Sequence, residues 1–237
     1  MEVVKFTLSG RLAHFKNPEN NYYVEFSYGN IHKPALLGLI GAILGLRGRK
    51  QVKELGYIEY YELTKGLEIS IVPKKVKFNK FIDESINSTG FANAGSSQIL
   101  RREFLENPEW DIYLIQGKTE LAIWNNIKEN LMNGVYEYPI NLGGKKNLAL
   151  IKNVELLEAD PPASEQKIIN CECKSLILFN DIVEYEGIGV SEYLPIALNE
   201  LTLYEKKKFL ISDGKILMKN NNIYLIDNIY YYFLPSD

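Results

Sequence analysis

The stretch Gly29-Asn30-Ile31-His32-Lys33-Pro34, continued by residues 35–46 (ALLGLIGAILGL), decides the fold of this chain. Pro34 suits the first turn of a helix, where its missing N–H is no loss, and Leu, Ile and Ala fill the following turns. Nearly every side of this helix is apolar, so it has to be buried on all faces. It is too short to cross a bilayer, and the segment Arg47-Gly48-Arg49-Lys50 stops it. We predict a buried core helix over residues 34–46.

Three glycines share one face of this helix, because Gly38, Gly41 and Gly45 are spaced by three and four residues. Each costs about 1 kcal/mol relative to Ala in a helix interior. In return, the glycine face lets another part of a structure approach very closely. A sheet, a subunit or a ligand can use such a face, and we predict tight packing on the protein's own sheet.

The composition is that of a globular protein. With 237 residues, 46% hydrophobic and 24% charged, the chain can form one large domain or two small ones. It opens with no charged and apolar leader and has no long apolar run, so we expect a cytoplasmic protein without a membrane partner. Cys171 and Cys173 lie in an apolar stretch with no third Cys or His nearby. We interpret them as core residues and expect neither a metal site nor a cofactor.

The net charge of −3 hides a division between the two halves of the chain. Residues 1–102 hold 15 Lys and Arg against 9 Asp and Glu, whereas residues 103–237 hold 12 against 21. A basic first half favours a polyanionic partner, and an acidic second half favours solvent or basic protein surfaces.

The order of predicted elements indicates an α+β protein. Its first part reads as strand 2–8, the core helix, strand 66–72, strand 110–115, helix 118–132 and strand 148–156. This order is that of a ferredoxin-like fold over residues 1–157. Thr119 is the predicted helix cap and Gly134 the helix stop, while residues 49–63 fit helix or strand equally.

A second, smaller region follows the Asp160-Pro161-Pro162-Ala163-Ser164 linker. Residues 165–237 contain short apolar segments at 167–179, 209–218 and 223–233, with turn residues at 212–214 and 220–222 between them. We predict a β-rich C-terminal subdomain from this pattern.

The segment 74–102 reads as an insertion between two strands of the first domain. Its ends are basic, and residues 85–97 between them are small and polar without periodicity. Its candidate RNA contacts are Lys74, Lys75, Lys77, Lys80, Phe91, Arg101 and Arg102. Asp83 and Glu84 are the only acidic residues of the segment that oppose these cations. The pattern is typical of a finger that grips single-stranded RNA through phosphates and stacks or wedges bases with Phe78, Phe81 and Phe91. A flexible surface loop is the alternative.

Other basic residues stand next to loops that can hold phosphate. They are Arg11, His14 and Lys16 after the first strand, His32 and Lys33 before the core helix, Arg47 and Arg49 after it, and Lys145 and Lys146 in the loop 143–147. The N–H groups of a helix start and of two glycines favour an anion. His14 can equally be a hydrogen-bonded structural histidine, and Gly-Gly-Lys can be an ordinary hairpin turn.

Several of these segments together resemble a known family. Ser9-Gly10, then Ala13-His14-Phe15-Lys16, a loop with tyrosines, and Pro34 opening a helix that reads GLIGAILGL are similar to the Cas five family of CRISPR-associated proteins, with type I-B members closest. The likeness is specific over residues 1–50, looser at 97–108 and 138–146, and slight in the last eighty or so residues.

The resemblance implies a fold and a function. That family belongs to the repeat-associated RNA-binding (RAMP) superfamily, with a ferredoxin-like, RRM-like domain and a "thumb" hairpin at the place of the 74–102 insertion. Its members cap the 5′ handle of the guide RNA in the Cascade complex, beside the backbone and large subunits. Target DNA would meet this chain only through the assembled complex.

Three function classes follow from the sequence. The first is this non-catalytic RNA-binding subunit, and the third is a protein adaptor without nucleic acid. The second is a metal-independent endoribonuclease, because a tyrosine, a lysine and a histidine carry RNA cleavage in one branch of the family. Tyr28, His32 and Lys33 are the candidates here, but they do not match that branch's arrangement. We expect no cleavage.

Overall fold

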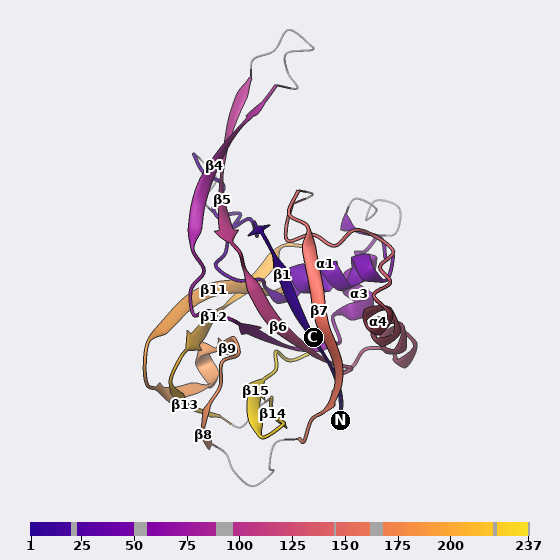
Figure 1. Ribbon diagram of the computed structural model, residues 1–237, viewed down its shortest axis with the longest axis vertical. Coiled ribbons are helices and arrows are strands. Elements are labelled where there is room, and N and C mark those ends of the chain that lie inside the picture. The colour runs from indigo at the N-terminus through magenta and orange to yellow at the C-terminus, as the bar shows by residue number, and fades with distance from the viewer. Residues whose placement is uncertain are drawn as a thin grey trace.

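The computed structural model describes residues 1–19, 23–49, 56–88, 97–144, 146–161, 168–219 and 222–236. Within these ranges strands predominate and helices are few, which confirms the α+β class (Figure 1). The helices are α1 (Lys33–Ile43), α3 (Glu59–Thr64), α4 (Leu121–Asn133) and the 3-10 helix η3 (Phe179–Asp181). None of these helices has the length and apolar character that crossing a bilayer requires.

The strands fall into two groups along the chain. The first group is β1 (Glu2–Gly10), β2 (Leu12–Ala13), β3 (Glu68–Pro73), β4 (Lys80–Asn87), β5 (Gln98–Glu106), β6 (Glu109–Ile115) and β7 (Ala149–Glu158). The second group is β8 (Ile168–Glu172), β9 (Ile177–Leu178), β10 (Ile182–Tyr185), β11 (Gly189–Leu198), β12 (Tyr204–Ser212), β13 (Lys215–Lys219), β14 (Ile223–Ile226) and β15 (Ile229–Tyr232).

Four strands of the first group form the central sheet in the order β3-β6-β1-β7, and every neighbouring pair is antiparallel. β1 has partners on both sides and is buried on both faces, which explains its nearly continuous apolar sequence. Val4, Phe6 and Leu8 belong to the core that also contains the apolar residues of α1 and α4. Val3 belongs to a separate cluster on the opposite face.

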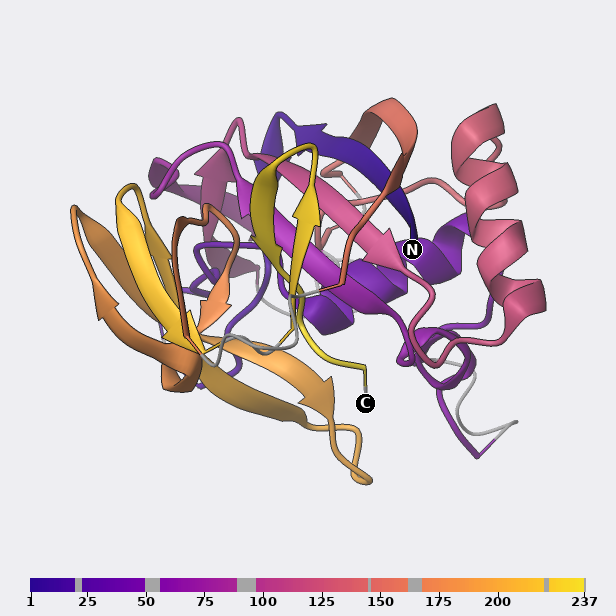
Figure 2. The ribbon, with the colours of Figure 1, turned by 90° about the horizontal axis from the view of Figure 1, so that it is seen from below.

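That opposite face is covered by the end of the chain. In the second cluster Val3 packs with Tyr113 and Phe233, and Figure 2 shows the β14 and β15 hairpin lying across the sheet. The backbone of Ile69 exchanges two hydrogen bonds with that of Leu234, at 3.3 and 2.7 Å. The C-terminal residues therefore form the layer that covers this face of the central sheet.

The second part of the chain is β-rich, as the sequence predicted. Its strands form the sheets β10-β13-β8 and β11-β12-β9 and the β14-β15 hairpin. The long strand β11 was not predicted, because its sequence lacks a clear alternation. One core joins buried residues from both parts of the chain, so the parts share an interior. The division at 157 and 165 stays a prediction, and residues 162–167 of the predicted linker lie outside the described ranges.

The two cysteines are part of this shared interior. Cys171 and Cys173 are 8% and 1% exposed and carry free thiols. Burial raises the pKa of both thiols, that of Cys171 to about 12. At neutral pH they are small apolar core groups, as the sequence predicted.

Helix α1 begins at Lys33, and His32 caps it by accepting a hydrogen bond from the N–H of Ala35 at 3.3 Å. The helix ends at Ile43 rather than at residue 46, because Leu44 caps it and Gly45 adopts a φ of 74°. The basic residues after it are therefore not what stops the helix.

The glycine face of α1 packs on a helix, not on the sheet as predicted. A Cβ on Gly41 would lie 2.4 Å from Cβ of Tyr60 in α3, and one on Gly38 would lie 3.7 Å from the Tyr60 ring. Residues 59–64, where the sequence fitted helix or strand, are thus helical because a helix brings Tyr60 into this groove.

Helix α4 differs from the prediction at its start. It begins at Leu121, with Glu120 in the cap position and no side-chain cap bond. Thr119, the predicted cap, is 4% exposed, and its hydroxyl has no partner among the described residues. Gly134 ends the helix in the left-handed conformation, as predicted.

The 74–102 insertion contains a two-stranded hairpin, β4 paired with β5, which stands out from the body (Figure 1). The sequence predicted no regular structure from residue 85, yet β4 continues to Asn87. Cross-strand pairs support it: the rings of Phe81 and Phe104 stack at 5.9 Å. Phe78 is instead buried against Trp110, so it cannot contact RNA. The tip, with Phe91, lies outside the described residues.

The contact between α1 and α3 predicts opposite effects for two similar substitutions. Gly41→Ala should lower the free energy of unfolding by about 1–3 kcal/mol, because the new methyl group overlaps Tyr60. Gly38→Ala is the matched control, since its methyl group meets Tyr60 at ordinary contact distance. It should raise stability by up to about 1 kcal/mol through helix propensity. Urea unfolding measures both, and equal changes in the two variants would contradict this packing.

Candidate nucleic-acid interface

A cavity of about 640 Å³ opens at the base of the hairpin. Five parts of the chain form its walls: the loop after β2, the start of α1, the hairpin strands, the loop 143–147 and the start of β12. Its lining residues are His14, Phe15, Lys16, Glu25, His32, Ala35, Asp83, Ser85, Arg102, Phe104, Gly143, Gly144, Lys146, Asn147 and Tyr204. The cavity thus combines basic side chains with several aromatic rings.

Five residues that the sequence singled out as RNA contacts meet in this cavity, namely His14, Lys16, His32, Arg102 and Lys146. They come from segments up to 132 positions apart, as His14 and Lys146 show. Lys146 is exposed and has no ion-pair partner among the described residues. Cations beside aromatic rings can hold phosphates and stack bases of a single strand.

The loop 143–147 reaches the cavity through a close backbone contact. Gly143 has a φ of 86°, and a Cβ there would lie 1.8 Å from the carbonyl oxygen of His14. Only glycine fits this position. The N–H of His14 donates to the carbonyl of Leu142 at 3.1 Å and fastens the loop to the segment after β2.

His14 presents one ring nitrogen to the fold and keeps the other unpaired. Its Nδ1 lies 2.8 Å from the carbonyl oxygen of Glu103, so Nδ1 carries the proton and donates. Nε2 is then an acceptor, and it is buried without a partner among the described residues. Burial lowers the pKa of His14, and the bond to Glu103 opposes that shift. Through Nδ1, His14 is the hydrogen-bonded structural histidine that the sequence allowed. Its Nε2 can still accept a hydrogen bond from a ligand.

His32 sits between three rings at the start of α1. Those of Tyr28 and Tyr204 have centroids 5.4 and 5.2 Å away, and Phe15 also contacts it edge-on. Burial and the nearby Arg49 lower the pKa of His32 to about 3. Its Nδ1 accepts from Ala35, so the ring is neutral at physiological pH and carries its proton on Nε2.

Two of the three candidate nuclease residues do not line the cavity. Tyr28 is 2% exposed, its hydroxyl has no partner among the described residues, and burial raises its pKa. Lys33 is fully buried, and its Nζ donates to the carbonyl of Pro235 at 2.7 Å. The predicted phosphate contact of Lys33 is therefore wrong, because the C-terminal segment covers this side chain.

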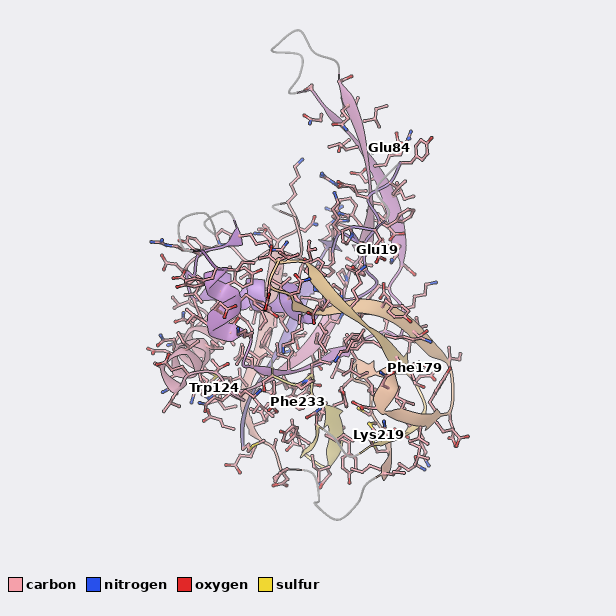
Figure 3. All side chains as sticks on the ribbon, turned by 180° about the vertical axis from the view of Figure 1, so that it is seen from behind. Glu19, Glu84, Trp124, Phe179, Lys219 and Phe233 are labelled. Atoms are coloured by element: carbon pink, nitrogen blue, oxygen red, sulfur yellow. The ribbon has the colours of Figure 1, made fainter. Side chains whose placement is uncertain are left out.

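Most basic residues of the insertion are paired with acidic side chains. Lys74 pairs with Asp111, Lys80 with Glu103, Arg101 with Glu84 and Arg102 with Glu25. The sequence counted only Asp83 and Glu84 as opposing charges, because the other three acids are distant in the chain or follow the insertion. Figure 3 shows Glu84 on the part of the hairpin that projects from the body.

The remaining predicted contacts lie outside the cavity. Arg11, Arg47, Lys75 and Lys77 are exposed elsewhere on the surface. Arg49 donates to the carbonyl of Thr202 at 2.8 Å and lies over the Tyr204 ring, 5.3 Å from its centroid. Lys145 and Phe91 lie outside the described residues.

Several cavity residues were missed by the sequence. Phe104 follows Arg102 by two positions on β5, and this spacing could have placed both on one face of a strand. Nothing near Glu25 or Tyr204 in the sequence marks either residue. Phe15 also lines the cavity, but it is 4% exposed and packs against Trp110. Among the described residues, no group of His, Cys, Asp or Glu could hold a metal ion.

Comparison with solved structures shows what this chain is similar to. A crystal structure of a CRISPR protein from Archaeoglobus fulgidus matches with a TM-score of 0.53 and 11% identity over 100% of both chains. A chain of a CRISPR RNA-guided surveillance complex matches with a TM-score of 0.52 and 11% identity over 90% of this chain and 91% of its own. These likenesses establish a shared fold.

A third match is partial. The crystal structure of a Cas protein aligns at 19% identity with a TM-score of 0.39, over 61% of this chain and 57% of that one. No protein-family model and no curated protein sequence matches the chain.

The buried state of His32 predicts a loss of stability in acid. An unfolded His32 binds a proton below a pH of about 6.5, whereas the folded one resists protonation down to about 3. Stability should therefore fall as the pH drops below about 6.5, by up to about 1.4 kcal/mol per pH unit from this group. His32→Asn keeps a cap acceptor and should flatten that slope. Urea unfolding between pH 4.5 and 7.5 measures it, and unchanged slopes in the variant would contradict the assignment.

Proposed function

We propose that this chain is a non-catalytic RNA-binding subunit of a type I CRISPR Cascade complex, of the Cas five family near type I-B. In this proposal it caps the 5′ handle of the guide RNA and contacts the backbone and large subunits. The observation that carries it is the meeting of five predicted RNA contacts in one cavity at the base of the hairpin. The fold shared with CRISPR-associated structures supports the same assignment.

The arrangement of the first part supports the ferredoxin-like assignment. Read from its other edge, the sheet order is β7-β1-β6-β3, with β1, α1, β3, β6, α4 and β7 following one another among these elements of the chain. The hairpin of β4 and β5 leaves the domain between β3 and β6, where the resemblance places a thumb. In this interpretation the cavity at the base of the hairpin holds the RNA, and the basic residues at the two ends of the 74–102 insertion do not hold it alone.

The cavity offers a single strand two kinds of contact. Lys146 supplies positive charge, and the loop glycines supply backbone N–H groups for phosphates. The rings of Phe104 and Tyr204 supply surfaces on which bases stack. These contacts suit RNA that is single-stranded, and they require no cofactor.

Cleavage of the repeat is the alternative, and the contact between the Tyr28 and His32 rings is what favours it. RNA cleavage without a metal needs a base, an acid and a cation near the reacting phosphate. Nδ1 of His32 is occupied as the helix cap, and Lys33 is buried against Pro235. These positions support a non-catalytic role. An adaptor that binds no nucleic acid is disfavoured by the basic and aromatic cavity.

The first test asks whether Lys146 contacts RNA. The wild-type protein, purified in low salt from cells that carry its CRISPR array, should retain a discrete short RNA. Lys146→Gln should weaken binding of that RNA and reduce the slope of log affinity against log salt by about 0.7, the value for one phosphate contact of a single strand. Lys128→Gln removes the same charge from α4, where Lys128 pairs with Glu2, and should change neither. If no RNA is retained and none binds, the proposal is wrong.

The second test concerns catalysis. Pure protein incubated with its own repeat RNA in EDTA should leave the RNA intact, because Tyr28 and Lys33 do not line the cavity and Nδ1 of His32 is occupied as the helix cap. A cut at a single site, lost in His32→Asn while binding persists, would replace the structural role with the nuclease.

A further inference from the structure

Glu25 holds two of the cavity's cations. Its Oε1 accepts from Nζ of Lys16 at 2.6 Å, and its Oε2 accepts from Nε of Arg102 at 2.5 Å. All three side chains line the cavity, and the two cations are 47% and 41% exposed. Burial raises the carboxyl pKa, but the bonds from Arg102 and Lys16 outweigh it, and the pKa of Glu25 lies below its ordinary value. Glu25 is therefore an anion at neutral pH.

The backbone of Glu25 is fixed, whereas its carboxylate can move. The N–H of Glu25 donates to the carbonyl of Arg101 at 2.9 Å, and its own carbonyl accepts from the N–H of Glu103 at 3.0 Å. These bonds tie the residue to β5. Withdrawing the carboxylate from the two cations needs only rotation about side-chain bonds.

Two oxygens that bridge two cations are also what a backbone phosphate presents. The carboxylate of Glu25 thus occupies the position in which one phosphate of a bound strand would pair with Lys16 and Arg102. The surroundings point to a ligand independently. His14, 8% exposed, lines the same cavity with an unpartnered Nε2, and buried polar groups without partners are rare.

We infer that the Glu25 carboxylate is an internal substitute for a phosphate of the RNA, which displaces it from Lys16 and Arg102 on binding. This inference rests on the proposed function of the cavity. It means that Glu25 weakens RNA binding, although it orders the cations that bind RNA. It also means that RNA binding at this point releases a protein carboxylate rather than salt ions, so the salt dependence is smaller than the number of phosphate contacts suggests.

The test compares Glu25→Gln with a matched control. Glu155→Gln removes the same charge from β7, where Glu155 pairs with Lys5 outside the cavity. Binding of fluorescein-labelled rU12 by the full chain is measured by anisotropy between 50 and 300 mM KCl, roughly the range in which phosphate contacts are resolved. Glu25→Gln should bind about three- to tenfold more tightly at the lowest salt, the scale of two partly exposed ion pairs. Its salt slope should be steeper by about 0.7, and Glu155→Gln should resemble the wild type.

The outcomes separate the inference from the function on which it rests. If the wild type binds rU12 and Glu25→Gln binds equally or more weakly, Glu25 positions the cations and the inference is overturned, while the RNA-binding function stands. If no variant binds, the proposed function fails too. Should Glu25→Gln not fold, Glu25→Asp serves instead: its shorter side chain keeps the charge but cannot bridge both cations, so tighter binding supports the inference and unchanged or weaker binding overturns it.

Discussion

Helix α1 has no polar face, and the rest of the fold follows from the need to cover it. The central sheet covers one side, α3 and α4 pack beside it, and β11 of the second part contacts it as well. An apolar helix left partly exposed would lose the burial that stabilises it. The first part of the chain therefore cannot complete its own interior, and the second part closes over it.

Covering α1 also decides which of its polar neighbours are available to a ligand. Lys33 lies on the side closed by the C-terminal segment and is held by Pro235. His32 is enclosed by aromatic rings and occupied as the helix cap. Ala35 is the residue of α1 that lines the cavity, together with the loop glycines, and its N–H is already donated to His32. The same packing buries Lys33 and occupies Nδ1 of His32, so the cations of the cavity come from other parts of the chain.

The charges of the hairpin show why a count along the sequence is a poor measure of an RNA-binding surface. Asp111 and Glu25 come from outside the segment 74–102 and neutralise Lys74 and Arg102. Basic residues in ion pairs gain less from a phosphate than solvated ones, because an existing partner has to leave. Lys146, which has no ion-pair partner in the described part of the chain, and the displaceable partner of Arg102 make the cavity, rather than the whole insertion, the centre of the candidate interface.

The sequence by itself determined the α+β class, the core position of α1, the strand at β1, the end of α4 at Gly134 and the buried cysteines, because each depends on local apolar periodicity or on one residue's backbone preference. It also marked His14, Lys16, His32, Arg102 and Lys146 as contacts. Only the tertiary structure decided that these five meet while Lys33 does not, that Gly41 faces Tyr60, and that Glu25 bridges Lys16 and Arg102. Such pairings join residues distant in the chain, and side-chain contacts of this kind arise from packing rather than from any local pattern.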